Sequence, residues 1–155
     1  MTHPTDSQHT VTPPADESSL ARDHQVRWTG DATFIGTGGS GHSIILDGDK
    51  RLGLSPMELL LLAAGSCACI DVVMILEKAR QRLSDVRVEV GGKRRDELPR
   101  YFTSAQMHFV VEGTDIRETH VKRAIDLAME KYCSASAQLG ALATISTSYE
   151  IHLRD

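Results

Sequence analysis

The cysteines are the residues of this 155-residue chain best suited to chemistry, and there are three of them. Cys67 and Cys69 stand two positions apart in an apolar stretch. Side chains two apart on a helix point roughly 200° from each other, at about 100° per residue. They therefore cannot bond to each other or share one metal ion while the helix stays wound. Taken alone, a cysteine in an apolar helix is more often a small hydrophobic residue than a nucleophile.

Cys133 widens the chemistry that the chain can perform. It follows the predicted end of one helix and precedes a short helix expected over 135–142, and a helix N-terminus favours a thiolate. A buried cysteine and a second cysteine from another element form the layout of an attacking and a resolving thiol. Asp71, one turn after Cys67, would raise the pKa of that thiol. A reactive Cys67 therefore needs a cation or hydrogen-bond donors from elsewhere.

The stretch 55–82 predicts one long, almost wholly apolar helix that carries Cys67 and Cys69. Ser55 suits the N-cap, Pro56 suits the first helical position, and Glu58 completes a capping box. Such a helix has no solvent face, so we expect it to be buried on nearly all sides. A membrane span is disfavoured, because the run is shorter than the ~20 apolar residues that a span needs and contains Asp71.

The remaining segments predict the elements that must position the thiols. Residues 1–24 are polar and proline-rich, which indicates a disordered tail, and a single domain is expected over 25–155. We expect two or three antiparallel strands before the helix, then a β-hairpin over 86–112, a helix capped by Asp115 and Glu118, and a last strand over 145–151. This order predicts an α+β fold with a largely antiparallel sheet. A homodimer that packs the two central helices near its symmetry axis would bury their apolar surface.

The composition excludes several other classes of function. A net charge of −4 gives no indication of a nucleic acid or an anionic membrane as partner. Three cysteines and no export signal predict a reducing cytoplasm. The segment 36–41, GTGGSG, matches G-x-G-x-x-G, but a strand is expected after it, so a hairpin turn is favoured over a nucleotide site. His42 and His120 are too isolated to indicate a metal site, and no cofactor is expected.

Several motifs resemble those of the OsmC/Ohr superfamily. They are P-x-E-L-L-x-x-A-x-G-x-C over 56–67 followed by DVV at 71–73, EKYCS at 130–134, and SYE at 148–150. The stretch 26–151 resembles the YhfA-like branch, through RWTGDATFIG at 27–36, SGHSIILDG at 40–48 and ELPRYFT at 97–103. The resemblance implies an OsmC-like fold in which a long buried central helix lies in an intertwined homodimer.

The resemblance also implies an activity, since better-studied members are thiol-dependent peroxidases that reduce organic hydroperoxides. By motif position, Cys67 corresponds to the attacking cysteine and Cys133 to the resolving one, with Glu58 orienting the site. A dithiol, such as a lipoylated protein, would reduce the resulting disulfide. Glu58 stands one place later than in the peroxidase motif. The turn 36–41 lacks the arginine that the peroxidases carry in a similar turn, and Arg27 and Arg51 are the candidates to replace it. The alternatives are a non-enzymatic dimer that binds a small apolar or electrophilic ligand, and a thiol–disulfide or acyl-carrying role.

Overall fold

The computed structural model describes residues 23–154, which form two compact units divided between Gly53 and Leu54. The predicted tail over 1–24 lies outside the described residues except for Asp23 and His24, which precede the first strand. Each unit is described by itself.

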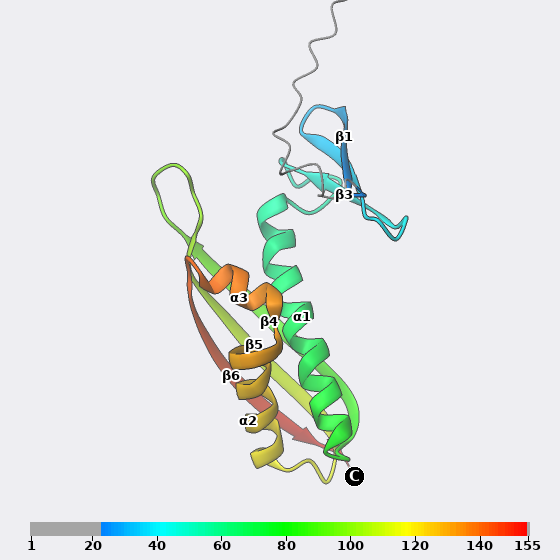
Figure 1. Ribbon diagram of the computed structural model, residues 1–155, viewed down its shortest axis with the longest axis vertical. Helices are drawn as coiled ribbons and strands as arrows, with labels where there is room; N and C mark the ends of the chain where they lie inside the picture. The colour runs from blue at the N-terminus through cyan, green and yellow to red at the C-terminus, as the bar shows by residue number, and fades with distance from the viewer. Residues whose placement is uncertain (1–22, 155) are drawn as a thin grey trace, which may run out of the picture. The chain divides into compact units, whose positions relative to one another are not determined.

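The first unit is a small antiparallel sheet with the strand order β1-β2-β3, as Figure 1 shows in blue and cyan. The strands are β1 (Gln25–Gly30), β2 (Thr33–Thr37) and β3 (Ser43–Asp47). The segment 36–41 leads into the β2–β3 turn, where the Gly38 N–H donates to the His42 carbonyl at 2.9 Å and Gly41 has a φ of 83°. The predicted hairpin turn is therefore confirmed.

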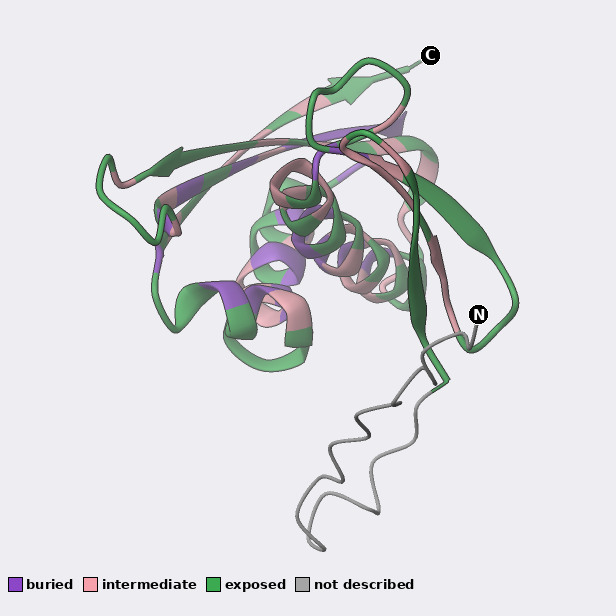
Figure 2. Ribbon diagram, turned by 90° about the horizontal axis from the view of Figure 1, so that it is seen from above, coloured by how far each residue is buried: buried purple, intermediate pink, exposed green. Residues whose placement is uncertain are grey.

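The second unit combines a three-stranded sheet with helices that cover one of its faces (Figures 1 and 2). The sheet order is β4-β5-β6, in which β4 and β5 are antiparallel while β6 runs parallel to β5. Its elements are α1 (Pro56–Lys78), β4 (Arg82–Arg94), β5 (Phe102–Thr114), α2 (Glu118–Leu127), the π-helical turn η2 (Ala128–Tyr132), α3 (Ser134–Gly140) and β6 (Thr144–Leu153).

The α+β class is confirmed, but the second sheet is mixed. The chain between β5 and β6 is helical and returns to the end of the sheet where β5 begins, so that β6 joins its neighbour in parallel. The expectation of a largely antiparallel sheet therefore holds for the first unit and for the β4–β5 pair only.

The start of α1 is as predicted. The Glu58 N–H donates to the Ser55 hydroxyl at 3.3 Å, and the Glu58 carboxylate accepts from the Ser55 N–H at 2.9 Å. The end comes earlier than the predicted Arg82. Arg80 has a φ of 57°, and the Gln81 N–H donates to the Leu76 carbonyl, which closes the helix at Lys78 so that β4 can begin at Arg82.

The core of the second unit lies where α1 packs against the sheet and against α2. One stripe of α1 is almost fully buried, and a Cβ on Gly65 would lie 2.4 Å from the Val90 Cγ2, so a glycine is needed for this close approach to β4. The core residues are Ala64, Ala68, Val72 and Leu76 from α1, Met107, Phe109 and Val111 from β5, and Val121, Ala124 and Ile125 from α2.

The opposite stripe of α1 is exposed in the single chain. Leu62, Ile70 and Met74 lie on it, and Ile70 is 61% exposed. The prediction that α1 is buried on nearly all sides is therefore not met within one chain. A helix of this composition also satisfies the length and hydropathy criterion of a membrane span, with a mean hydropathy of 2.4. That is weak evidence, because core helices of soluble proteins satisfy it too.

The start of α2 differs from its prediction. Its N-cap is Arg117, which makes no side-chain capping hydrogen bond, and Asp115 has a φ of 55°. Asp115 therefore belongs to the turn before the helix and does not cap it. The Glu118 carboxylate instead accepts a hydrogen bond from the Tyr149 hydroxyl on β6 at 3.0 Å.

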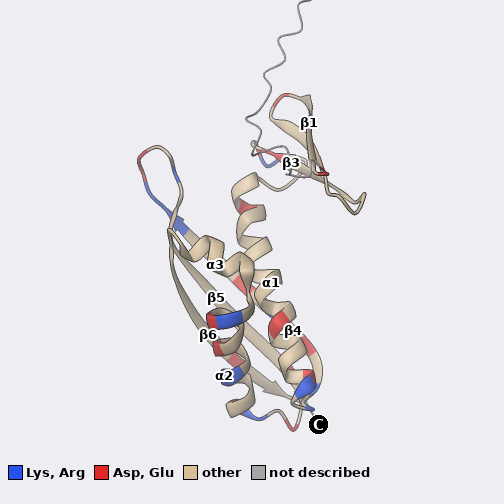
Figure 3. Cartoon of the chain, viewed as in Figure 1, with Lys and Arg blue, Asp and Glu red and all other residues tan. Residues whose placement is uncertain are grey.

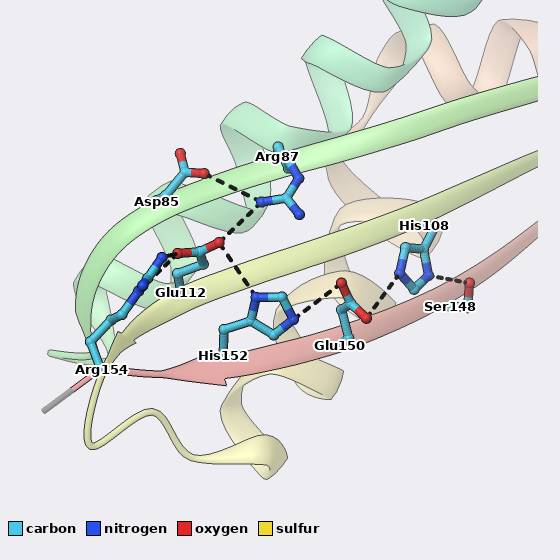
Figure 4. Close-up of polar contacts among 8 residues, drawn as sticks. All are labelled: Asp85, Arg87, His108, Glu112, Ser148, Glu150, His152 and Arg154. Atoms are coloured by element: carbon cyan, nitrogen blue, oxygen red, sulfur yellow. Dashed lines mark hydrogen bonds and ion pairs between the residues drawn. The ribbon is translucent and has the colours of Figure 1, made fainter.

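The sheet face away from the helices carries a chain of polar contacts (Figure 4). Glu112 has a side chain that is only 10% exposed, and it accepts from Arg87 at 3.1 Å and from Arg154. These two arginines hold the pKa of Glu112 below its ordinary value, with Arg154 the larger influence. The chain continues through His152, Glu150 and His108 to Ser148 and so links the three strands.

Candidate functional site

The structure brings Cys67 and Cys133 together. The two Sγ atoms and a carboxylate oxygen of Asp71 all lie within 4.8 Å of one another. Cys67 and Asp71 are neighbours on successive turns of α1, whereas Cys133 arrives from the junction of η2 and α3. We call these three residues the thiol cluster. Cys67 and Asp71 are partly buried, and Cys133 is 3% exposed.

The backbone around Cys133 is shaped by the π-helical turn. The Cys133 N–H donates to the Ala128 carbonyl at 2.8 Å, and the chain then leaves the helix with φ −70° and ψ 97° at Cys133 itself. The sequence predicted one regular helix through Tyr132, and periodicity gives no signal for the wider turn. π-Helical turns often occur at functional sites.

Cys133 is held in place by hydrogen bonds on both sides. Its Sγ accepts from the Ser136 N–H at 3.3 Å, which makes it the N-cap of α3. The same sulfur makes a hydrogen bond with the Ser136 hydroxyl at 3.0 Å, and it lies 3.7 Å from the Ala64 carbonyl of α1. The sulfur is therefore anchored against the backbone of the helix that carries Cys67.

Burial raises the pKa of the Cys133 thiol above its ordinary value, and the neighbouring Cys67 acts in the same direction. The hydrogen bonds with Ser136 oppose this shift without cancelling it. Cys133 is consequently a protonated thiol at neutral pH. Such a group is better suited to react second, with an already oxidised sulfur, than to attack first.

Cys69 lies apart from the cluster, as the helix geometry predicted. Its Sγ is 3.8 Å from the Val86 carbonyl of β4. Burial raises the pKa of Cys69, and the charge of Asp85 adds to the effect. Cys69 is therefore a packing residue between α1 and β4.

The thiol cluster has no cationic partner within residues 54–154, where no lysine or arginine forms a hydrogen bond or ion pair with Cys67, Asp71 or Cys133. Arg27 and Arg51, the two arginines considered from the sequence, belong to the first unit, and Arg51 pairs with Asp49 at 2.7 Å. Figure 3 shows that the blue residues of the second unit gather mainly at its strand ends, on the β4–β5 loop and on α2.

Glu58 is not brought to the thiols within this chain. Its carboxylate lies in the capping box with Ser55, at 2.7 Å from the Ser55 hydroxyl. Along α1 it stands roughly 13 Å from Cys67, at about 1.5 Å per residue.

A cavity of about 550 Å³ lies beside the cluster, between α1 and the end of α2. Asp71 lines it, and so does Tyr132, the residue before Cys133. Most of its remaining lining is apolar, with one acid and one base at the rim: Met74, Ile75, Leu127, Glu77 and Lys78. A small, largely apolar molecule in this cavity would lie against Asp71 of the cluster, whereas neither sulfur lines it.

The arrangement is that of a dithiol that can close to a disulfide. A disulfide needs its sulfurs about 2.05 Å apart, so closure from a separation of at most 4.8 Å requires only local movement.

Comparisons with known proteins agree with the fold. The family described as OsmC-like protein matches residues 47–148, a stretch that includes α1 and both cluster cysteines. Protein YhfA of Escherichia coli (strain K12) is 45% identical over 128 residues, which cover 82% of this chain and 96% of YhfA.

Two solved structures show how far the likeness extends. A hypothetical protein from Aquifex aeolicus VF5 has a TM-score of 0.79 and 30% identity, and the match covers 88% of this chain and 99% of that one. An organic hydroperoxide resistance protein OsmC from Legionella pneumophila has a TM-score of 0.62 and 14% identity, over 82% and 96% of the two chains. The second is a likeness of fold alone. On the family match and the identity to YhfA, this chain belongs to the OsmC-like protein family.

Proposed function

We propose that this protein is a thiol-dependent peroxidase that reduces small organic hydroperoxides. The observation that carries the proposal is the approach of Cys67 and Cys133, from elements far apart in the sequence, to within 4.8 Å. The OsmC-like family membership supports it, as does the shared fold of a Legionella protein that is described as conferring organic hydroperoxide resistance.

The reaction proceeds in two steps on the protein. The Cys67 thiolate attacks one peroxide oxygen, the O–O bond breaks, and the other oxygen takes up a proton and leaves as an alcohol. Cys67 is then a sulfenic acid. The Cys133 sulfur attacks the Cys67 sulfur, water leaves with the thiol proton, and a disulfide remains. An external dithiol, such as a lipoylated protein, reduces this disulfide and is itself oxidised to a disulfide.

The roles of the two cysteines follow from their surroundings. Cys67 is partly exposed and is the more accessible sulfur, whereas Cys133 is buried with a raised pKa and suits the resolving role. Glu58 is a positioning residue in this proposal, because its capping box fixes where α1 begins and hence the turn on which Cys67 stands.

We further propose that the protein works as a homodimer in the cytoplasm. The exposed apolar stripe of α1 supports a second copy as its partner, because isolated soluble chains seldom leave such a surface in water.

The test is consumption of a small organic hydroperoxide with dihydrolipoamide as reductant, in the presence of a chelator. Wild type and Cys69→Ser are expected to turn over at similar rates, while Cys67→Ser loses all consumption above background. Cys133→Ser should complete one turnover and accumulate a sulfenic acid that a dimedone probe labels. No consumption by wild type, or undiminished consumption by Cys67→Ser, contradicts the proposal.

A second candidate function is favoured by the apolar cavity and by the cation-free surroundings of the thiols within residues 54–154. In this alternative the dimer binds a small apolar or electrophilic ligand without turnover. Native mass spectrometry of the purified protein distinguishes the two, because a retained ligand or a Cys67 adduct, together with no peroxide consumption, supports binding. A ligand-free protein that consumes peroxide rejects it.

A further inference from the structure

The thiol cluster contains a donor set that neither the sequence pattern nor the proposed reaction requires. The reaction needs two sulfurs, but a carboxylate oxygen of Asp71 lies with them, each of the three atoms within 4.8 Å of the others. Residues 67 and 71 point the same way because they are one helical turn apart. The third donor comes from Cys133 on another element, which is how proteins commonly assemble a metal site.

The spacing is close to that of a tetrahedral zinc site. With Zn–S of about 2.3 Å and Zn–O of about 2.1 Å, ligand atoms on one ion lie roughly 3.5–3.8 Å apart. Atoms at most 4.8 Å apart must therefore close by no more than about 1.3 Å, which side-chain rotation on α1 can supply.

A divalent cation would also neutralise the charge that the two sulfurs acquire when they coordinate it, beside a carboxylate that lies partly out of water. No lysine or arginine in the described part of the second unit bonds to these groups. Two sulfur donors select a borderline-soft ion over magnesium or calcium, which prefer oxygen ligands.

We propose that reduced Cys67, Asp71 and Cys133 bind one Zn²⁺ ion per chain. Each thiol releases its proton to solvent as its sulfur coordinates, and the fourth position remains open to water. Cys69 takes no part, since its sulfur faces the β4 carbonyl of Val86. Zinc binding and disulfide formation use the same two sulfurs and so exclude each other. Zinc binding by these three side chains does not require peroxidase activity.

The first experiment titrates Zn²⁺ into the reduced, full-length protein against a chromogenic zinc chelator, without oxygen. Wild type and the Cys69→Ser control are expected to bind one ion per chain with the same affinity. The affinity should fall at least about 100-fold in Cys67→Ser and in Cys133→Ser, and about 10-fold in Asp71→Asn. Circular dichroism verifies that each variant is folded. If wild type binds no more tightly than a Cys67→Ser/Cys133→Ser double variant, the inference is wrong.

A second experiment needs no variant. Zn²⁺ should slow the alkylation of Cys67 and Cys133 by iodoacetamide, measured peptide by peptide with mass spectrometry, and leave Cys69 unchanged as an internal control. Addition of EDTA should restore the original rates. Equal effects on all three cysteines, or none, would reject the site even if the protein proves to be a peroxidase. Conversely, clear protection in a protein without peroxidase activity would uphold the site alone.

Discussion

At the scale of single residues, the neighbours of a side chain determine its role more than its residue type does. Three cysteines of one chemistry occupy three environments: Cys67 is partly exposed beside Asp71, Cys69 faces a strand carbonyl, and Cys133 is buried under hydrogen bonds from Ser136. The carboxylates differ in the same way. Glu58 completes a helix cap, whereas Glu112 accepts hydrogen bonds from two arginines. Each role depends on the neighbours that the fold supplies.

The charge of Glu112 is expected to stabilise the folded protein in a pH-dependent way. Because its pKa is depressed in the folded protein, chiefly by Arg154 and Arg87, its charge stabilises the fold above the ordinary glutamate pKa of about 4.3. That stabilisation is lost as the pH falls through the lower folded pKa. Glu112→Gln should therefore lower the free energy of unfolding in urea at pH 7, and the difference from wild type should shrink toward zero in acid.

The matched control for that series is Glu89→Gln, an exposed glutamate on the neighbouring strand β4 with no ion pair among the described residues. It should change the unfolding free energy little at any pH. A Glu112→Gln difference that persists below pH 3 would show that the effect comes from shape and not from charge.

At the scale of elements, the contact between α1 and β4 determines where the thiol cluster lies. Gly65 allows α1 to approach β4 closely, and Cys67, two residues later on α1, lies beside Cys133 at the start of α3. The π-helical turn at 128–132 delivers Cys133 to the same place. The two elements must both pack correctly before the sulfurs can meet.

Gly65→Ala tests this packing. Alanine favours the helix by about 1 kcal/mol, but its Cβ would lie 2.4 Å from the stiff Val90 side chain, and overpacking typically costs about 1–3 kcal/mol. We expect a net destabilisation in urea unfolding. The double variant Gly65→Ala/Val90→Ala removes the clashing methyl group and should lose less stability than the two single changes added together. Simple additivity would contradict the steric explanation.

At the scale of the whole molecule, α1 presents an apolar stripe that a single chain leaves exposed. Its buried stripe packs against β5 and α2, while Ile70 and Met74 on the other stripe are 61% and 62% exposed. Transfer of such side chains out of water is favourable by about 25 cal/mol per Å². A homodimer about α1 is the proposal that accounts for this surface.

Sedimentation velocity tests the dimer. Wild type is expected to sediment at twice the chain mass of 17.0 kDa, and Ile70→Asp should yield monomers because it places a charge in the apolar contact. Leu98→Asp, at a position 84% exposed in the β4–β5 loop, is the control and should remain dimeric. A wild type that sediments as a monomer would contradict the homodimer proposal.

Sequence patterns predicted the features that depend on residues close together in the chain. Ser55, Pro56 and Glu58 determine the start of α1, glycines mark the β2–β3 turn, and the helical angle alone separates Cys67 from Cys69. The end of α1, the cap of α2 and the π-helical turn were missed, because a left-handed Arg80 or Asp115 and a widened turn leave no mark in periodicity.

The amino-acid sequence by itself determined the class of fold, the order of the helices and strands and the residues able to do chemistry, since these depend on neighbours in the chain. Only the tertiary structure decided that β6 runs parallel to β5 and that Cys133 reaches Cys67 and Asp71. Both depend on the helical return between β5 and β6. Its path is selected by the packing of the whole unit against α1, a sum of many contacts between residues distant in the chain.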